Sequence, residues 1–469
     1  MGFLRRALMG FAFTSTVMAL DMSERNLPSA PPSSSPPPVR QDNDWTLAKW
    51  WSGESAIPST ALRSGLADTG VDFSGSYVAD FLGSVSGGES RAFAYTHTLE
   101  GQLVFDLEKL TRWQGASITW SFADNAGSNL QNAVGNIFTP SNLFGPNTFY
   151  FGEFYLTQKL FEEAVQIKLG QLCAKEDFGS SPIYGNYLNS AFNGNPLVPF
   201  GTYPMSSFPV SSWGAFVHGD LKMDDALLNF YGQAGIYQVS DRMGIYAYKG
   251  MDYSIRSNDG TMALWEVGWS PSFFSTPSES FPPAGKSVAG EKSAVATVEN
   301  RGYPGHYKFG GFLSNWSYAT TSGASEPTTY GFYFTADQQV TMEKDNPAEG
   351  LVLWAALGWT PQESLNEIPV GISGGLQYTG LIPQRSEDIA LLGIGYAMVA
   401  RAGAGFEDRI NERLDFTGSG YEIAIEGTYV IQVNRWMSVQ PDIQYIINPG
   451  ALGKDQNAWI LGGQITINF

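Results

Sequence analysis

Carboxylate and amide side chains recur at every second position near the C-terminal end of the chain, with isoleucine, valine and tyrosine between them. Because successive side chains of a β-strand point to opposite faces, this spacing predicts strands with one apolar face and one hydrogen-bonding face. Such groups bind water and hydroxyl groups reversibly, as acceptors and donors. The hydrogen-bonding positions of the two clearest segments are Glu422, Glu426, Asp442 and Gln444.

The sequence does not show the residue pattern of an active site or of a metal centre. It contains three histidines, His97, His218 and His306, and the sequence around them offers no serine that could act as a nucleophile. Strand alternation even places His97 on an apolar face. The single cysteine, Cys173, cannot form an internal disulfide and has no second cysteine for a metal cluster. We therefore expect no catalytic residues, no metal and no cofactor.

The composition points to an all-β protein without a nucleic-acid partner. Aromatic residues make up 14% of the 469 residues, glycine occurs 53 times, and only 15% of the residues are charged. This mixture favours strands over helices, whose surfaces are rich in lysine, glutamate and alanine. The formal net charge is −18, and the chain lacks the clustered lysine and arginine residues that phosphate binding needs.

From Val71 onward the alternation repeats in segments of about ten residues, which is typical of a transmembrane antiparallel β-barrel of about 16 strands. A soluble β-sandwich or propeller would also alternate, but tyrosine and tryptophan at the ends of the apolar faces favour the membrane barrel. Apart from the C-terminal segments at about 421–431, 437–446 and 459–469, the expected strands are 71–81, 92–106, 115–124, 150–160, 164–171, 212–220, 226–239, 261–270, 305–315, 328–341, 350–360, 369–381 and 388–401.

Connection lengths predict the orientation of this barrel. The long connections at about 125–149 and 172–211 follow odd-numbered strands, and most connections after even-numbered strands are short. Because outer-membrane barrels have short periplasmic turns and long external loops, the long connections should be external. Residues 271–303, which follow the eighth strand, are an exception: they are either an unusual periplasmic insert or a sign of a miscounted strand.

Four regions are expected along the chain. Residues 1–20 carry two arginines before a short apolar stretch and resemble a secretory signal peptide. Residues 21–43 form a linker rich in proline and serine, and residues 44–70 form a short periplasmic lead-in with helical potential. Residues 71–469 form the barrel.

The C-terminal run contains a glutamate at the start of a strand, then Pro441–Ile446, then Asn448–Gly450, and a closing strand that ends in Phe469. In these features it resembles the OprB-type carbohydrate-selective porins of Gram-negative outer membranes. Weaker matches are LRSGLADTGV at 62–71, NAVGNI at 132–137, KLGQ at 168–171, and GLIPQRSED at 380–388, with Arg385 and Asp388 in a short turn.

The resemblance implies a 16-stranded barrel through which sugars diffuse across the outer membrane, in contact with outer-membrane lipid. It also implies that Phe469 belongs to the signal read by the barrel-assembly machinery, and it leaves both a monomer and a homotrimer open. The proline-rich leader and the 271–303 insert depart from the family pattern.

A sugar path needs hydrogen-bonding groups for hydroxyls and rings for apolar C–H faces. Strand parity assigns the pore-lining candidates, which are Glu422, Glu426, Asp442, Gln444, Glu100, Gln102, Lys308, Trp354 and Arg401. The uncharged loop 180–211 suggests a constriction that involves Tyr184, Tyr187, Phe192 and Asn193, although it could instead be a rigid shield over the mouth. A general, non-selective diffusion porin and a soluble sugar-binding protein are the alternative functions.

Overall fold

The computed structural model describes most of the chain beyond residue 60. The described residues are 61–143, 145, 147–195, 205–221, 223, 227–274, 302–316, 318–319, 325–326, 328–343, 346–362, 365–366, 368–399, 420–451 and 453–469. Of the regions expected at the N-terminus, those at 1–20 and 21–43 lie outside these ranges, and their boundaries remain predictions.

Sixteen long antiparallel strands form the wall of a closed barrel, as the alternation predicts. The sheet has 17 strands, of which one, β9 (Ser272–Phe273), is a two-residue addition beside β10. The wall strands are β1 Val71–Gly88, β2 Ala92–Asp106, β3 Ala116–Gly127, β4 Thr148–Leu160, β5 Val165–Leu172, β6 Ser212–Leu221, β7 Phe230–Val239, β8 Gly260–Trp269, β10 Tyr303–Ser314, β13 Thr329–Gln339, β14 Gly350–Trp359, β15 Val370–Thr379, β16 Ile389–Met398, β17 Tyr421–Asn434, β18 Met437–Ile447 and β19 Gln456–Asn468.

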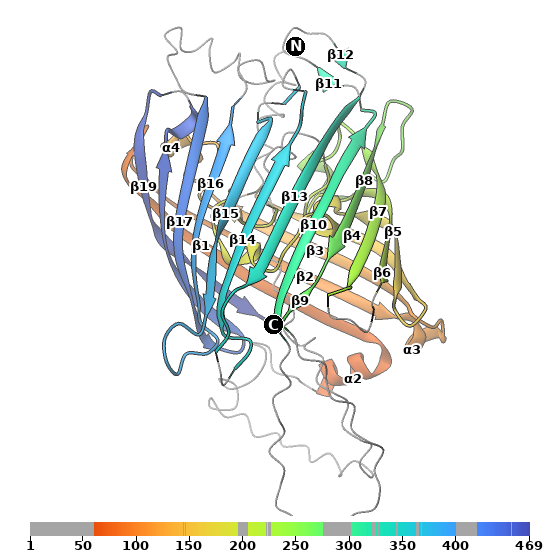
Figure 1. Ribbon diagram of the computed structural model, residues 1–469. Helices are drawn as coiled ribbons and strands as arrows, with labels where there is room; N and C mark the ends of the chain where they lie inside the picture. Colours follow the sequence, from red (N-terminus) through yellow and green to blue (C-terminus); the bar gives the residue numbers. More distant parts are fainter. Residues whose placement is uncertain are drawn as a thin grey trace, which may run out of the picture.

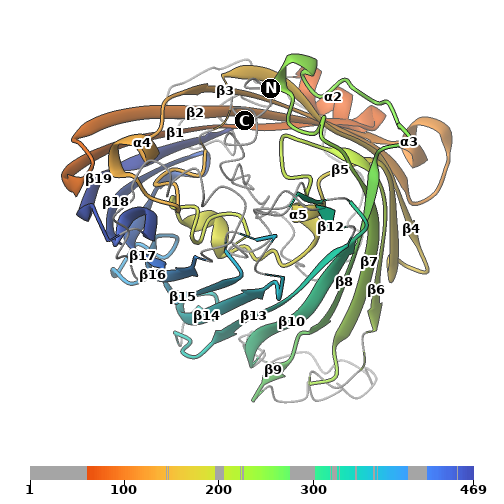
Figure 2. The same ribbon diagram turned by 90° about the horizontal axis from the view of Figure 1, so that it is seen from above.

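Each wall strand pairs with its neighbours in the chain, and the first strand pairs with the last. The closing seam aligns Tyr77 of β1 with Ile467 of β19 and Phe81 with Gly463. Figure 1 shows the tilted strands from the side, and Figure 2 shows the ring that they form. Closure leaves no unpaired sheet edge within lipid, where an unpaired backbone group costs several kcal/mol.

The helical elements are short and lie in the connections between strands or, for α2, before the first strand. They are α2 Ala61–Thr69, α3 Leu107–Thr111, α4 Gln131–Val134, α5 Ala174–Asp177 and the 3₁₀ turns η2 Tyr184–Asn186, η4 Tyr246–Tyr248 and η5 Pro449–Ala451; a further small hairpin joins β11 Tyr318–Ala319 to β12 Ser325–Glu326. None of the helices in the described ranges combines the length and the hydropathy needed to span a bilayer.

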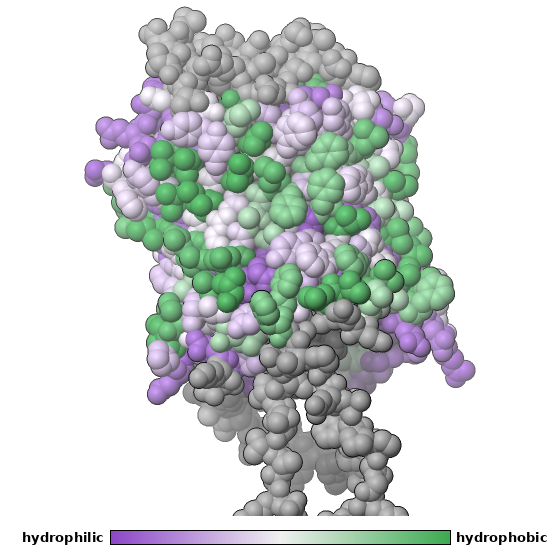
Figure 3. All heavy atoms as spheres, viewed as in Figure 1, coloured by the Kyte–Doolittle hydropathy of each residue, from purple (hydrophilic) through white to green (hydrophobic). Residues whose placement is uncertain are grey.

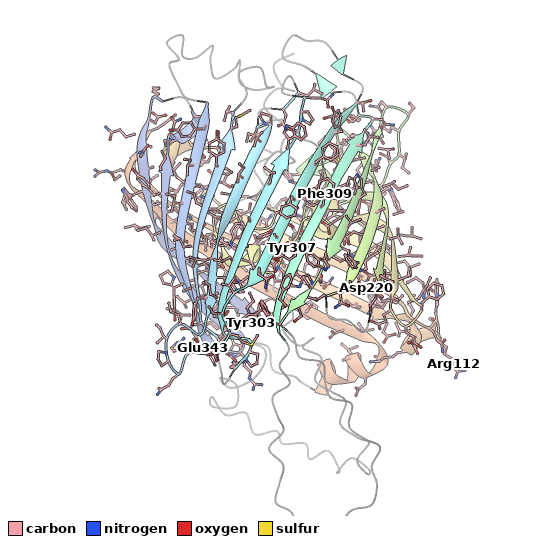
Figure 4. All side chains as sticks on the ribbon, viewed as in Figure 1. Arg112, Asp220, Tyr303, Tyr307, Phe309 and Glu343 are labelled. Carbon is pink, nitrogen blue, oxygen red and sulfur yellow. The ribbon has the colours of Figure 1, made fainter. Side chains whose placement is uncertain are left out.

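The two ends of the barrel differ, which fixes its orientation. In Figure 1, α2, α3 and the chain's C-terminal end lie at one end, and α4 with the β11–β12 hairpin lies at the other. Arg112, Tyr303 and Glu343 mark the first end in Figure 4. Because the turns at this end are mostly short, we assign it to the periplasm.

Alternation separates a lipid-facing surface from the interior, as β14 illustrates. Leu353 and Leu357 are 45% and 40% exposed, whereas the intervening Trp354 is 4% exposed. Apolar side chains cover much of the outer wall in Figure 3. Aromatic rings run along the outer face of β10, where Tyr307 and Phe309 (Figure 4) contact Trp269 and Trp265 at centroid distances of 5.2 and 5.3 Å.

Several strand boundaries differ from the expected ones by three or more residues, and the end of β1 differs most. β1 continues to Gly88, because the Gly- and Ser-rich residues 82–88, whose pattern does not alternate, still pair with β19 across two irregularities. β7 begins at Phe230 rather than at 226, and β16 ends at Met398 rather than at 401. Eight wall strands precede residue 271, so no strand was miscounted there; residues 275–301 of the insert lie outside the described residues.

Candidate functional site

The described residues of two external connections fold back into the barrel and occupy its interior. Inner loop A (128–147, described except for 144 and 146) joins β3 to β4, and inner loop B (173–211, described except for 196–204) joins β5 to β6. Figure 2 shows the segment that carries α5 inside the ring of strands. The loops are bonded to each other: the backbone N–H of Asn142 donates to the carbonyl of Leu188 at 2.9 Å, and that of Ser190 donates to Thr139 at 2.9 Å. They therefore form one internal structure that narrows the lumen.

Glu422 fastens inner loop A to the wall. Its carboxylate accepts backbone N–H groups from Ile137 at 2.8 Å and Phe138 at 2.8 Å, and a third from Gly450 at 2.6 Å. The side chain is fully buried, and a buried carboxylate is tolerated only when its oxygens are hydrogen-bonded. Three segments that carried the family resemblance, at 132–137, at Glu422 and at 448–450, thus meet at one carboxylate.

Glu426 does the same for inner loop B. Its two oxygens accept the N–H groups of Leu188 at 2.7 Å and Asn189 at 2.8 Å. The amide of Asn189 donates to Gln444 at 2.9 Å, and Gln444 donates to the carbonyl of Pro140 at 2.8 Å and to Asp442 at 2.9 Å. All four C-terminal candidates thus face the interior but are enclosed beneath the loops, with exposures between 0 and 6%.

The aromatic residues of inner loop B pack around Trp354 of the wall. The rings of Tyr184, Tyr187 and Phe192 lie 5.2, 5.7 and 6.2 Å from the tryptophan ring. The indole N–H of Trp354 donates to the Tyr187 hydroxyl at 3.1 Å. All of these side chains are at most 4% exposed, so in this structure a solute cannot stack on these rings. They hold the loop against the wall.

Asn193 links the two inner loops. Its side-chain oxygen accepts a hydrogen bond from the amide of Asn142 at 2.8 Å, and its own amide donates to the carbonyl of Tyr187. The residue is 1% exposed. Its position is that of a brace between the loops rather than of a pore surface.

A second group of wall side chains holds the beginning of inner loop B. The N–H of Gly179 donates to Glu266 at 2.8 Å, and the hydroxyl of Tyr333 donates to the same carboxylate at 2.6 Å. The ammonium group of Lys308 donates to the carbonyl of Ser180. Lys308, which was assigned to the lumen by parity, is therefore another anchor of the loop. Sequence reasoning missed Glu266, although it is the single charged residue of β8 and stands at an inward position.

Glu100 and Gln102 of β2 are half-buried, unlike the enclosed candidates of β17 and β18. Glu176 of α5 is close enough to Glu100 for their charges to interact, and Lys175 stands beside it in the sequence. Burial lowers the pKa of Lys175 to about 8. This side of the lumen therefore presents charged and amide groups from both the wall and inner loop B, and all four side chains are only partly covered.

Lys168, within the KLGQ segment, is a further residue that sequence reasoning did not propose for the site. Its ammonium group pairs with Asp177 of α5 at 2.5 Å. It lies 5.5 Å from the ring centroid of Tyr155 and 5.2 Å from that of Phe216, where the ring quadrupoles favour a cation. The pair fixes α5 to the β4–β6 side of the wall.

The remaining candidate, Arg401, lies outside the described residues. Across the described ranges, no group of three or more histidine, cysteine, aspartate or glutamate side chains is arranged to hold a metal ion.

Comparisons with known proteins agree with this architecture. Porin B of Pseudomonas aeruginosa is 24% identical over 460 residues, covering 91% of this chain and 92% of that protein. The putative porin QuiX of Acinetobacter baylyi is 22% identical over 460 residues, covering 92% and 94%. The high-pH structure of Pseudomonas putida OprB has a TM-score of 0.75 at 23% identity, covering 89% of this chain and 100% of that one.

A sequence model described as the carbohydrate-selective porin, OprB family, matches residues 90–469. This range takes in all but the first strand and part of the first connection of the barrel. The chain therefore belongs to the OprB family of carbohydrate-selective porins, which are non-enzymatic channels of the outer membrane.

Proposed function

We propose that mono- and small oligosaccharides cross this porin between inner loop B and the β1–β3 side of the wall, past Glu100 and Gln102. The observation that carries this proposal is where the loop is attached: Cys173 and Asp177 at its start bond to β4 and β5, and the residues that follow bond to every wall strand from β8 to β18. In chain order of these strands, Gly179 donates to Glu266, Lys308 to Ser180, Ser181 to Asp337, Trp354 to Tyr187, Asn186 to Gln377, Tyr187 to Leu392, Leu188 to Glu426 and Asn189 to Gln444.

The chemistry of the open side suits a neutral, hydroxyl-rich solute. Glu100 accepts hydrogen bonds, Gln102 both donates and accepts, and the half-buried Lys175 and Glu176 add a donor and an acceptor from the loop side. Charges of both signs across a narrow lumen hold oriented water and exchange it for sugar hydroxyls at little net cost. No single site needs to bind so tightly that release becomes slow.

In this proposal, the candidates that bind or pack against the inner loops act on the sugar indirectly. Glu422, Glu426, Asp442, Gln444, Lys308, Trp354 and the constriction residues Tyr184, Tyr187, Phe192 and Asn193 set the position of the loops, and the loops set the width of the path.

Liposome swelling with the purified, refolded protein tests the proposal. Glucose and a disaccharide are compared with amino acids and zwitterions of matched size. We expect the sugars to enter faster than their size predicts, and we expect Glu100→Ala and Gln102→Ala to reduce this advantage severalfold. Glu162→Gln, in the exposed turn between β4 and β5, is the matched control. Entry that depends on size alone would place the protein with the general diffusion porins.

Assembly through the C-terminal residue belongs to the same proposal. Phe469 exchanges two backbone hydrogen bonds with Gly75, at 2.8 and 2.9 Å, and its ring stacks 6.3 Å from Phe73. We expect Phe469→Ala to lower the fraction of heat-modifiable, folded barrel recovered from outer membranes. Homotrimer formation remains a prediction, and sedimentation of the detergent-solubilised protein distinguishes it from a monomer.

A further inference from the structure

The ladder between β4 and β5 stops short of the external rim. β5 pairs with β4 only from Phe154 to Leu160, so the upper part of β4, residues 148–153, has no partner strand on that side. The connection between β7 and β8 reaches this edge. The backbone N–H of Phe151 donates to the carbonyl of Lys249 at 2.9 Å. Gly250 follows with φ +78°, a conformation that favours glycine. A Cβ at this position would lie only 1.9 Å from the carbonyl oxygen of Phe151, so a larger residue does not fit against this edge.

The rim segment, which we define as residues 246–256, is fastened to the barrel along one side. The guanidinium group of Arg242 donates to Asp252 at 3.0 Å, and Gln238 donates to the carbonyl of Ser254 at 3.1 Å. The indole of Trp213 donates to the carbonyl of Tyr253 at 2.9 Å. The hydrogen bond from Ser254 holds the pKa of Asp252 below its usual range, so this carboxylate stays ionised beside the arginine.

The other side of the rim segment is apolar and exposed. Met251, Tyr253 and Ile255 alternate with Asp252 and Ser254, and their exposures are 54, 46 and 73%. This is the period-two pattern of an extended segment that lies flat, with its polar side chains against the protein.

This apolar side continues the lipid-facing surface of the wall. Trp213, which binds the rim segment, is an outward residue of β6, and its ring lies 6.3 Å from that of Tyr253. The outward Ile236 of β7 is 56% exposed, and the next outward position above it is Gln238. The change from isoleucine to glutamine marks the upper limit of the apolar band, so the rim segment lies at the interface, where tryptophan and tyrosine are favoured.

Two exposed cations, Lys249 and Arg256, flank the apolar side chains. An exposed row of apolar side chains with cations at both ends matches an acylated lipid that carries phosphate groups. Continuity with the lipid-facing wall favours a lipid of the outer leaflet over a soluble anion, because the phosphate contacts and the acyl contacts then occur on one molecule.

We propose that the rim segment is a lipid-binding strap, in which Met251, Tyr253 and Ile255 enter the acyl layer and Lys249 and Arg256 bind the phosphates of an anionic outer-leaflet lipid. The strap covers the unpaired upper edge of β4 on the outside, and the bound lipid presses it against the barrel. This binding surface is separate from the sugar path, which lies inside the wall.

Lipid binding by the refolded, full-length protein tests this proposal. The probes are bisphosphorylated lipid A, monophosphorylated lipid A and phosphatidylcholine, with bound lipid counted by native mass spectrometry. We expect Lys249→Gln with Arg256→Gln to weaken binding of the bisphosphorylated lipid by roughly thirtyfold, because each cation near an anionic surface contributes about 1 kcal/mol, and to affect the monophosphorylated lipid less. Met251→Ser with Ile255→Ser should weaken both forms of lipid A.

The matched control removes two exposed cations elsewhere, by Arg91→Gln with Arg112→Gln; Arg112 lies at the opposite end of the barrel (Figure 4). Each variant is first shown to be folded by its heat-dependent gel migration. Unchanged lipid A binding by the Lys249 and Arg256 double variant overturns the proposal, as does an equal loss in the control. If inorganic phosphate competes for the strap as strongly as lipid A does, the strap is a simple anion site, and this result also overturns the proposal.

Discussion

At the scale of single residues, the barrel uses buried carboxylates as acceptors for loop backbone. Glu422 and Glu426 are four positions apart on one strand, and each receives N–H groups from two consecutive loop residues. A carboxylate has enough lone pairs to accept several donors at once, and backbone donors do not depend on the side chain that the loop happens to carry. The fixed position of each loop therefore depends on a wall residue far away in the sequence.

Removing one of these acceptors should loosen the loop that it holds. In Glu426→Ala, the N–H groups of Leu188 and Asn189 lose their partner, at a cost of about 1–3 kcal/mol per unsatisfied buried group. We expect a larger and noisier single-channel conductance in planar bilayers, with the barrel still folded. Glu162→Gln is the control, and a conductance trace identical to the wild type would contradict the anchoring role.

Lys175 should make ion selectivity depend on pH. Its folded-state pKa of about 8 lies below the usual 10.5 because burial disfavours the charged form. The lumen therefore loses one positive charge as the pH rises through about 8, and the preference for cations should increase between pH 7 and 9. Between about pH 8 and 10.5 the unfolded chain binds the extra proton, so stability rises with pH in that window.

Reversal potentials across a salt gradient measure this effect. Lys175→Met, which carries no titratable group, should show no shift over the same range. A wild-type pH response that persists in Lys175→Met would assign the titration to another group.

The face of the strand on which a side chain lies could be predicted from the sequence, but the burial of that side chain could not. The period of two is a local property, and it correctly directed Glu422, Glu426, Asp442 and Gln444 inward. What covers these residues is a loop more than 200 positions earlier in the chain, and no local pattern encodes that contact. For the same reason the composition of the loop suggested rings at a narrowing, whereas the structure encloses Tyr187 and Phe192 around Trp354.

At the scale of elements, two periplasmic turns are joined by a pair of side chains. Arg385 donates to Asp388 at 2.6 and 2.7 Å, and Asp388 also accepts the backbone N–H of Gln432 at 2.9 Å. Burial alone raises the pKa of Asp388, but the bonds from Arg385 and Gln432 outweigh it and hold the pKa below the usual range. The turn between β15 and β16 is thereby attached to the end of β17.

This attachment should stabilise the barrel at neutral pH and fail in acid. A carboxylate with a lowered folded-state pKa contributes stability above its unfolded value of about 3.9 and loses that contribution as the pH falls through the folded value. We expect Asp388→Asn to unfold at lower urea concentration than the wild type at pH 7, with the difference vanishing at the acid end. A difference that is independent of pH would indicate lost packing instead of a lost charge.

Most elements followed from the sequence because each strand carries its own alternating pattern. The prediction failed where the alternating pattern is absent or too short. Residues 82–88 of β1 are rich in serine and glycine, and they form strand because β19 lies beside them. The rim segment alternates as clearly as a strand over five residues, yet pairing partners of such a short run cannot be deduced from its sequence.

At the scale of the whole molecule, the wall and the internal loops are separable. Every wall strand pairs with its neighbours without help from inner loops A and B. Deleting residues 180–193 should therefore leave a folded barrel. The deletion would uncover the carboxylates of Glu266 and Glu426, but these groups face the lumen and would meet water instead of hydrocarbon. The prediction is a several-fold rise in conductance together with the loss of sugar preference in liposome swelling.

Folding of the deletion variant is checked first by heat-dependent gel migration. If the shortened protein folds but keeps its wild-type conductance, inner loop B does not set the width of the path. If conductance rises while sugar preference remains, selectivity resides in the wall around Glu100 and Gln102 alone.

The anchors Glu422, Glu426 and Gln444 all belong to β17 and β18, which are among the last strands of the chain. The inner loops come from connections made much earlier, so the contacts that hold them at β17 and β18 form only when the last strands are in place. The same end of the chain closes the wall, because β19 pairs with β1. Closing the wall and fixing the width of the path are therefore completed together.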